Sequence, residues 1–271
     1  MSGAPTALPE IRVYPGRPPL DARPLAKRVG LIILATDHTT EPDFRRMVAS
    51  EHVGVYVARI AYANPTTPDN LRKMQPGLAE GAGLILPGET LDVICYACTA
   101  ASAVIGDAEV AAAIHEGKPG VPVVTPPLAA ARGLKALAAK RISVLTPYTV
   151  ETTRPMLAYF AAHGFEIASS TCLGFTDDRE MARIAPSGLV ELARDTTAAD
   201  ADALFISCTA LRAASVAHEI ELAIGRPVVT SNQATAWNCL RLLRDAAPRP
   251  ELGRLMTMPM NDEDMNQHDH A

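Results

Sequence analysis

Two cysteines occupy matching sequence frames in the two halves of this 271-residue chain. The first frame reads Asp92-Val-Ile-Cys-Tyr-Ala-Cys98-Thr-Ala, and the second reads Asp202-Ala-Leu-Phe-Ile-Ser-Cys208-Thr-Ala. Both pass from an aspartate through an apolar strand to a Cys-Thr pair and then into a predicted helix. Because thiolates act as nucleophiles and bases, the pair predicts a site with one sulfur on each side of a small substrate.

The spacing that separates Cys98 from Cys208 also relates a second pair of polar segments. His38 and Thr39 map onto Tyr148 and Thr149, and each pair follows an apolar strand. Landmarks that recur in the same order along a chain indicate an internal duplication. We therefore expect the loops that carry these residues to open into the same cleft as the two cysteines.

The elements that must position these residues alternate between short apolar runs and helical stretches. Predicted strands cover residues 29–35, 54–60, 92–97, 121–125, 142–145, 166–172, 203–207 and 227–230, and predicted helices include 100–115, 152–163 and 211–223. Continuous apolar strands that alternate with helices are typical of parallel α/β sheets. The sequence predicts two similar doubly wound parallel-sheet domains related by pseudo-two-fold symmetry, with the active site in the cleft between them.

Each cysteine should lie just after a strand, at the start of a helix, where free N–H groups favour a thiolate. This position predicts a lowered pKa for Cys98 and Cys208. The same N–H groups, with the hydroxyls of Thr99 and Thr209, could hold a substrate carboxylate. The alternative is that each cysteine is a small inert core residue, as free cysteines often are.

The loop residues have their own candidate roles. Tyr148 could donate a hydrogen bond to a carboxylate or a developing enolate. His38 could donate while neutral, or add positive charge when protonated. For Thr39 and Thr149 the alternative role is to cap the helix that follows.

Metal and cofactor motifs are missing from the sequence. Cys95 and Cys98 form a C-x-x-C, but Cys95 lies inside a predicted strand and no second pair completes a zinc site. Cys172 and Cys239 have no visible partner. The chain has no G-x-G-x-x-G, no G-x-x-x-x-G-K-[ST] and no G-x-S-x-G motif, so we predict no cofactor and no metal.

Composition narrows the classes of partner and location. A formal net charge of −5 and a pI near 5.8 argue against nucleic acid as a partner. No apolar run reaches the roughly 20 residues of a membrane span, and no secretory signal is visible, so a cytoplasmic location with reduced thiols is expected.

The two ends of the chain are expected to differ from the folded part. Residues 1–27 are rich in Pro and Arg and predict an extended arm, either loosely attached or laid across a second subunit. Residues 259–271 are acidic and predict a disordered tail, in which His268 and His270 have no metal role.

The paired Cys-Thr frames, the Thr-Pro-Tyr-Thr loop and the duplicated halves resemble the aspartate/glutamate racemase superfamily. Within it, residues 28–245 look most like the maleate cis-trans isomerase and arylmalonate decarboxylase branch. The phrases Ala-Thr-Asp-His-Thr-Thr-Glu and Ser-Cys-Thr-Ala-Leu-Arg look closer still to racemase-like proteins of bacterial ectoine utilisation. The resemblance implies no cofactor, a homodimer or dimer of dimers, a first domain of residues 28–126 plus 231–258, and a second domain of residues 127–230.

Two departures from that branch bear on the substrate. Maleate isomerases usually carry asparagine where His38 stands and another near Asp178, and those amides hold substrate carboxylates. The Asp178 carboxylate would repel a second substrate carboxylate, so a substrate with an amino or other cationic group would suit it better than maleate. Arylmalonate decarboxylases keep only the second cysteine, so two cysteines argue against simple decarboxylation.

The resemblance implies a cofactor-independent isomerase or racemase that acts on a small carboxylate. Alternatives are a decarboxylase of the arylmalonate type and a non-catalytic metabolite-binding protein of ectoine utilisation. Cys98 and Cys208 are the expected catalytic residues. The expected substrate-binding residues are His38, Thr39, Thr99, Tyr148, Thr149, Asp178 and Thr209.

Overall fold

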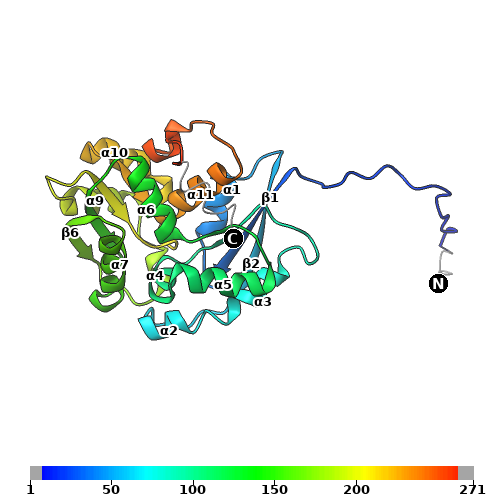
Figure 1. The fold of residues 1–271 in the computed structure, drawn as a ribbon, viewed down its shortest axis with the longest axis horizontal. Helices are drawn as coiled ribbons and strands as arrows, with labels where there is room; N and C mark the ends of the chain where they lie inside the picture. Colours follow the sequence, from blue (N-terminus) through cyan, green and yellow to red (C-terminus); the bar gives the residue numbers. More distant parts are fainter. Residues whose placement is uncertain (1–7, 262–271) are drawn as a thin grey trace, which may run out of the picture.

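Two four-stranded parallel sheets form the framework of the protein, seen in a computed structural model that describes residues 8–261 (Figure 1). The first sheet has the order β2-β1-β3-β4, and the second has the order β6-β5-β7-β8. The strands are β1 Lys27–Leu34, β2 Val53–Ile60, β3 Val93–Tyr96, β4 Val123–Val124, β5 Arg141–Thr146, β6 Glu166–Cys172, β7 Ala203–Ile206 and β8 Val228–Thr230. All eight predicted strands are present, and the two sheets repeat one topology, so the predicted fold class is confirmed.

The helices separate the strands in chain order. They are α1 Thr40–Met47, α2 Pro68–Arg72, α3 Gly77–Leu84, α4 Thr99–Ile105, α5 Asp107–Gly117, α6 Pro126–Ala136, α7 Val150–Ala162, α8 Asp178–Met181, α9 Pro186–Thr196, α10 Ala217–Ile224 and α11 Ser231–Leu242. The single helix predicted over 100–115 is wrong, because Gly106 adopts a φ of 107° and separates α4 from α5. The helix predicted over 211–223 is a 3₁₀ turn, Arg212–Ser215, followed by α10.

Two hydrophobic layers sandwich the sheets, and each layer runs through both halves. Alternate residues of β1 illustrate this, because Val29 and Leu31 belong to one layer and Ile32 to the other. The first layer holds side chains of α1, α6, α7 and α11, and the second holds side chains of α2 to α5 and α8 to α10. Because both cores cross the boundary between the halves, the halves are fixed relative to each other.

The aspartate in each cysteine frame secures the opposite end of its sheet from the cysteine. The Asp92 carboxylate accepts a hydrogen bond from the backbone N–H of Arg28 at 2.8 Å, and Asp202 accepts one from Arg141 at 2.8 Å. Each bond joins the amino ends of two neighbouring strands. The aspartates therefore recur in both frames because they fix the same strand junction twice.

Helix α11 returns from the second sheet to the first. It follows β8 through a capping box between Thr230 and Gln233, and it packs against α6, α1 and β3. The division into residues 28–126 plus 231–258 and residues 127–230 stays a prediction.

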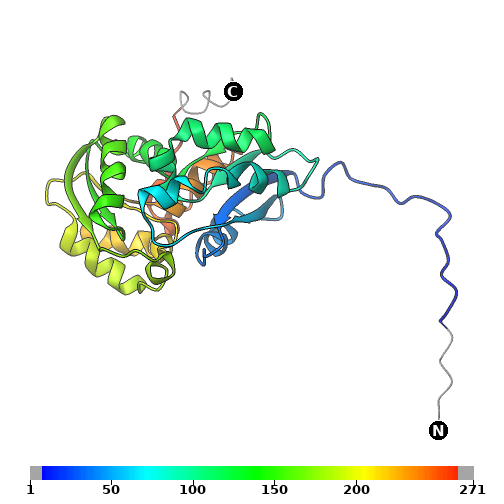
Figure 2. The same cartoon turned by 90° about the horizontal axis from the view of Figure 1, so that it is seen from below.

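Residues 8–26, before β1, leave the folded body as an extended stretch of chain without helix or sheet (Figures 1 and 2). Near its end, Arg23 forms an ion pair with Asp92 at 3.3 Å. Large apolar side chains along it are 75–93% exposed, namely Leu8, Ile11, Val13, Tyr14 and Leu20. Most of the predicted acidic tail, including His268 and His270, lies outside the described residues.

No helix within residues 8–261 combines the length and the apolar character that crossing a membrane requires.

Candidate active site

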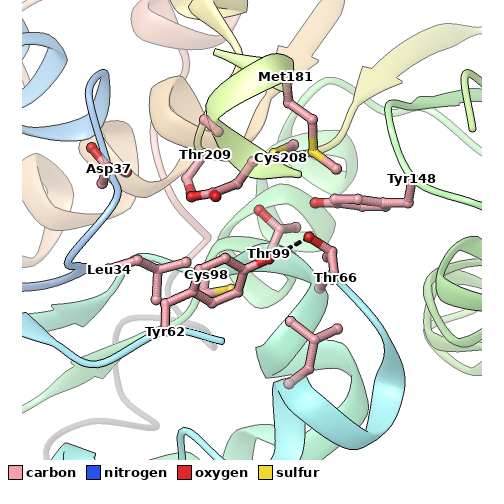
Figure 3. A pocket seen from close by; sticks show the side chains of 14 residues that line it. Leu34, Asp37, Tyr62, Thr66, Cys98, Thr99, Tyr148, Met181, Cys208 and Thr209 are labelled. Atoms are coloured by element: carbon pink, nitrogen blue, oxygen red, sulfur yellow. Dashed lines mark hydrogen bonds between the residues drawn. The ribbon is translucent and has the colours of Figure 1, made fainter. Parts of the chain in front are cut away.

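One cavity lies where the carboxyl ends of the two sheets face each other (Figure 3). Together with its open mouth it has a volume of about 360 Å³. Parallel sheets bind ligands at this edge, as expected from the sequence. The lining residues come from the carboxyl ends of six strands and the segments that follow them, namely Leu34, Asp37, Tyr62, Thr66, Leu71, Cys98, Thr99, Ala100, Tyr148, Asp178, Met181, Cys208, Thr209 and Ala210.

Both predicted cysteines line this cavity, and Figure 3 shows them on opposite sides of it. Cys98 is the N-cap residue of α4 and has extended backbone. Cys208 has a φ of 97°, a conformation that is costly for a residue with a Cβ and that is found mainly at functional sites. Its backbone N–H donates to Ser231 Oγ at 3.0 Å, which helps to hold the strained turn.

Burial controls the state of both thiols. It raises the pKa of Cys98 and of Cys208 to about 12, although nearby donors oppose the shift. The N–H of Ala101 lowers the pKa of Cys98, and the Tyr148 hydroxyl lowers that of Cys208. The predicted lowering of these pKa values is wrong for the free protein, because loss of solvation outweighs the N–H groups.

Tyrosine hydroxyls accompany the sulfurs. Tyr148 is 2% exposed, its hydroxyl accepts from Ser207 Oγ at 3.4 Å, and the same hydroxyl lowers the pKa of Cys208. Tyr96, from within β3, lowers the pKa of Cys98. The structure therefore places Tyr148 in the cavity, where it can donate to Cys208.

The predicted threonines separate into two groups. Thr99 and Thr209 line the cavity, but Thr99 Oγ1 donates to Ser231 Oγ at 2.8 Å and Thr209 Oγ1 donates to the carbonyl of Ala97 at 3.0 Å. The hydroxyl protons of Thr99 and Thr209 are thus used in hydrogen bonds within the protein that connect the two halves. Ser231 joins both cysteine frames, since it also accepts from the N–H of Cys208.

Thr39 and Thr149 do not line the cavity, contrary to the prediction. Thr39 Oγ1 donates to the carbonyl of Thr209 at 2.7 Å, so its hydroxyl supports the cysteine loop from behind. Thr149 is the N-cap of α7 and accepts from the N–H of Thr152. Thr149 therefore takes the capping role that was the alternative.

The structure places the side chain of His38 outside the cavity as well, on the exposed surface. Its neighbour Asp37 lines the cavity instead. The Asp37 carboxylate accepts from the N–H groups of Thr39 and Thr40, at 3.0 and 2.8 Å, and from the Thr40 hydroxyl at 2.6 Å. These bonds draw Asp37 inward to begin α1, so His38 points outward.

Asp178 lines the cavity from the first residue of α8 and is 6% exposed. The Thr36 hydroxyl donates to its Oδ2, whereas Oδ1 is buried and receives no hydrogen bond of normal geometry. Burial raises the pKa of this carboxyl. A buried carboxylate oxygen without a donor is costly, so this position calls for a ligand group.

Sequence reasoning missed Asp37, Tyr62, Thr66 and Met181 as lining residues. Tyr62 and Thr66 hydrogen-bond to each other through their hydroxyls, as the dashed line in Figure 3 marks. Both follow β2 at its carboxyl end, and that position was the available signal. Met181 Sδ lies 4.0 Å from Cys208 Sγ and closes the cavity on the apolar side.

Among residues 8–261, no lysine, arginine or histidine lines this cavity. Arg59 lowers the pKa of Asp37, and Arg179 lowers that of Asp178, through their positive charges. Arg59 forms an ion pair with Glu41 at 3.2 Å, and Arg179 forms one with Asp177 at 2.5 Å. The part of the chain that the structure describes also holds no group of three or more side chains suited to a metal ion.

The remaining cysteines lie elsewhere. Cys95 and Cys239 are fully buried in one hydrophobic layer, with their sulfurs 3.0 Å apart, so Cys239 does have a partner. Because Cys95 faces this layer, it does not share a site with Cys98, and the C-x-x-C motif has no joint role here. Cys172 is half-buried on β6.

Comparison with known proteins gives consistent results. A maleate isomerase from Nocardia farcinica is 28% identical over 241 residues, covering 85% of this chain and 95% of that protein. The Nocardia farcinica maleate cis-trans isomerase, solved as a mutant with a covalently bound succinylcysteine intermediate, has a TM-score of 0.78 and 25% identity, covering 85% of this chain and 98% of the other. A double mutant of arylmalonate decarboxylase in its liganded form has a TM-score of 0.75 and 27% identity, covering 84% and 98%.

The family model described as arylmalonate decarboxylase matches residues 96–256. This stretch contains both cysteines with the helices that follow them, Tyr148 and Asp178, and it spans more than half of the chain. The resemblance to the maleate isomerase and arylmalonate decarboxylase branch is thereby confirmed, and the protein belongs to the arylmalonate decarboxylase family.

Proposed function

We propose that the protein is a cofactor-independent isomerase or racemase that uses Cys98 and Cys208 on a small carboxylate. The observation that carries this proposal is the meeting of both sulfurs, from equivalent positions of the two halves, in one buried cavity. Packing does not require a second cysteine there. A reaction that adds a proton to one face and removes one from the other requires a group on each side.

Two forms of the reaction use the same parts. In racemisation, one thiolate removes the proton alpha to the carboxylate, and the opposite thiol delivers a proton to the other face. In cis-trans isomerisation, the Cys98 thiolate adds to one carbon of the double bond, and Cys208 gives a proton to the other carbon. After rotation about the resulting single bond, the same proton returns to Cys208 and the carbon–sulfur bond breaks.

The relatives favour an isomerase over the alternatives. The Nocardia farcinica maleate isomerase forms a succinylcysteine, which is the species that sulfur addition to maleate produces. Decarboxylation of the arylmalonate type is the second candidate, because the family match bears that name. Decarboxylation needs a single proton donor, so it would not explain the presence of Cys98 in the cavity. A role in ectoine utilisation, a cytoplasmic location and a dimeric assembly stay predictions.

The test is proton NMR in D₂O with maleate, aspartate, 3-hydroxyaspartate, hydantoins and diamino acids. We expect deuterium to enter one carbon of a substrate, or the cis isomer to convert to the trans isomer, with wild-type protein. Turnover should fall by at least about 10³-fold in Cys98→Ala and in Cys208→Ala, because each removes a reacting group.

The matched control is Cys172→Ser, which alters a half-buried cysteine outside the cavity and should keep full activity. Unchanged turnover in either alanine variant would exclude the two-sulfur mechanism. Loss of carbon dioxide from a malonate would support the decarboxylase instead. A ligand that stabilises the protein without any turnover would indicate a binding protein.

A further inference from the structure

The internal duplication makes the two walls of the cavity comparable residue by residue. Helix α8 repeats α2 at the same spacing that separates Cys98 from Cys208. Leu71 and Met181 are equivalent and both line the cavity, as apolar residues on both sides. One turn earlier, the equivalence fails, because Pro68 in α2 corresponds to Asp178 in α8. The second half therefore presents a carboxylate where the first half has a proline.

Only one of the two oxygens of the Asp178 carboxylate accepts a hydrogen bond from the described residues. Thr36 donates to Oδ2 of Asp178, and Oδ1 is buried without a donor. The N–H of Asp178 itself interacts weakly with the carboxylate but does not make a hydrogen bond of normal geometry. Asp37, the other acid of the cavity, differs in this respect, because protein donors reach both of its oxygens.

The charges around the cavity decide which kind of group suits the unpaired oxygen of Asp178. Two carboxylates line the cavity, and none of its lining residues is cationic in the part of the chain that the structure describes. The side chains of the arginines near them, Arg59 and Arg179, are 43% and 59% exposed and already paired with carboxylates. A ligand with two carboxylates would place one of them beside an acid in a site with little water, where like charges repel strongly.

We propose that the substrate carries a single carboxylate and an ammonium group, and that the ammonium donates to Asp178 Oδ1. This proposal rests on the proposed function and specifies its substrate class. It assigns Asp178 a substrate-binding role and makes maleate a poor ligand, although maleate isomerases are among the relatives.

Such a substrate would also lower the pKa of the two thiols. The negative charge of Asp178 raises the pKa of both Cys98 and Cys208. An ammonium bound to Asp178 would cancel that charge and favour a thiolate only when the cavity is occupied. The same contact would therefore select the substrate and prepare the reacting group.

Two matched probe pairs test the proposal by calorimetric titration of the full chain. Each pair replaces one carboxylate with an aminomethyl group: maleate against cis-4-aminocrotonate, and aspartate against 2,4-diaminobutyrate. We expect the aminomethyl member of each pair to bind about 10- to 100-fold more tightly to wild-type protein, the value of a charged hydrogen bond. Asp178→Asn should remove this preference or reverse it in favour of the dicarboxylates.

The control variant is Asp177→Asn, which neutralises the adjacent, more exposed acid and keeps a residue that caps α8. Its preference should equal that of wild type. Tighter binding of maleate to wild type would overturn the proposal and would mean that Asp178 is protonated and donates to a second carboxylate. An unchanged preference in Asp178→Asn would overturn it as well.

Binding is measured separately from turnover, so the two proposals fail in different ways. Cys98→Ser and Cys208→Ser should bind the aminomethyl probes like wild type, since neither changes Asp178. If the probes bind as expected but no compound turns over, the proposed reaction fails and the substrate-class proposal stands. If turnover occurs only with dicarboxylates, the substrate-class proposal fails and the reaction stands.

Discussion

The residues that define the site are two thiols kept neutral by their surroundings. Cys98 and Cys208 are 6% and 7% exposed, and each lies near a tyrosine hydroxyl and the buried Asp178 carboxylate. Reactive cysteines usually show a depressed pKa in the free protein, and these do not. Activation must therefore come with the substrate, which displaces water and brings its own charges.

We predict that alkylation of the free protein follows an unusual pH profile. Because burial raises both thiol pKa values to about 12, the thiolate is scarce at neutral pH and its fraction grows about tenfold per pH unit. The rate with iodoacetamide at these cysteines, read by peptide mass spectrometry, should still rise about tenfold between pH 10 and pH 11. A plateau above about pH 9.5, as for an ordinary thiol with a pKa of about 8.5, would contradict the raised pKa values.

Tyr148→Phe should raise the pKa of the Cys208 thiol and leave the reactivity of Cys98 unchanged. The change removes the hydroxyl that lowers the pKa of Cys208, so the Cys208 thiolate becomes harder to form. We expect kcat to fall by about 10- to 100-fold, in line with the loss of one charged hydrogen bond, and alkylation of Cys208 to slow. Alkylation of Cys98 in the same sample is the internal control, and equal slowing of both would mean a general change in the cavity.

Asp178→Asn should stabilise the free protein while it impairs function. Burial raises the pKa of Asp178 above 3.8, so the ionised carboxylate disfavours the folded state and the cost appears as pH rises through that raised value. At pH 7 we expect a gain of about 1–3 kcal/mol in the free energy of unfolding, measured by urea denaturation. The gain should shrink below pH 4, and a loss of stability at pH 7 would show that Oδ1 of Asp178 has a donor in the free protein.

At the scale of elements, the cavity depends on the N-terminus of α11. Ser231 Oγ accepts from Thr99 Oγ1 and from the N–H of Cys208, so one hydroxyl connects the two cysteine frames. The bond from the N–H of Cys208 to Ser231 Oγ is made at the residue with the strained φ of 97° and helps to hold that conformation. Thus α11 serves both sheets, although it follows only the second.

Ser231→Ala should therefore loosen the site. Two buried donors lose their acceptor, which we expect to cost about 1–3 kcal/mol of unfolding free energy and to reduce kcat by more than KM rises. Ser215→Ala is the matched control, because Ser215 is exposed and its hydroxyl donates to the Arg212 carbonyl, away from the cavity. Thermal denaturation and steady-state kinetics of both variants test this prediction. Equal losses of stability and of kcat in the two variants would contradict a specific role of Ser231 in the site.

Strands and the cysteine pair were predictable because they depend on local patterns and on the repeat. Apolar runs identified all eight strands, and the common spacing of the repeated landmarks brought Cys98 and Cys208 together. Side-chain direction in loops was not predictable. Whether Asp37 or His38 faces the cavity is decided by three hydrogen bonds to the start of α1, which no periodicity reports.

The thiol pKa values illustrate a second limit. Sequence position correctly indicated free N–H groups near Cys98, but the sign of the pKa shift depends on total burial. Burial is a property of the assembled cavity, to which residues from both halves contribute. A local motif therefore predicts where a thiol lies better than it predicts its charge state.

At the scale of the whole molecule, residues 8–20 of the arm carry apolar side chains that the rest of the described chain does not cover. Its apolar side chains Leu8, Ile11, Val13, Tyr14 and Leu20 are at least 75% exposed. Exposed apolar groups in series are typical of a segment that is covered in an assembly. The arm laid across a second subunit and the loosely attached terminus therefore both stay predictions, which an assembly measurement can separate.

Removal of the chain before Asp21 should reduce assembly without unfolding the body. We expect the sedimentation coefficient to shift from a dimer toward a monomer and the circular dichroism to stay unchanged, since Arg23 and its ion pair to Asp92 are kept. A full-length chain with Ile11→Ser and Val13→Ser is the companion variant and should shift in the same direction. An unchanged sedimentation coefficient in both would identify the arm as a free terminus.

The mismatch between Pro68 and Asp178 also bears on handedness. In a fully symmetric cavity, a small substrate could enter in two orientations, and either sulfur could meet either enantiomer. The Asp178 carboxylate, which has a proline and not an acid as its equivalent in the first half, removes that equivalence. In a racemisation, each sulfur would then take its proton from a single enantiomer, so a duplicated fold with twin cysteines would still distinguish left from right.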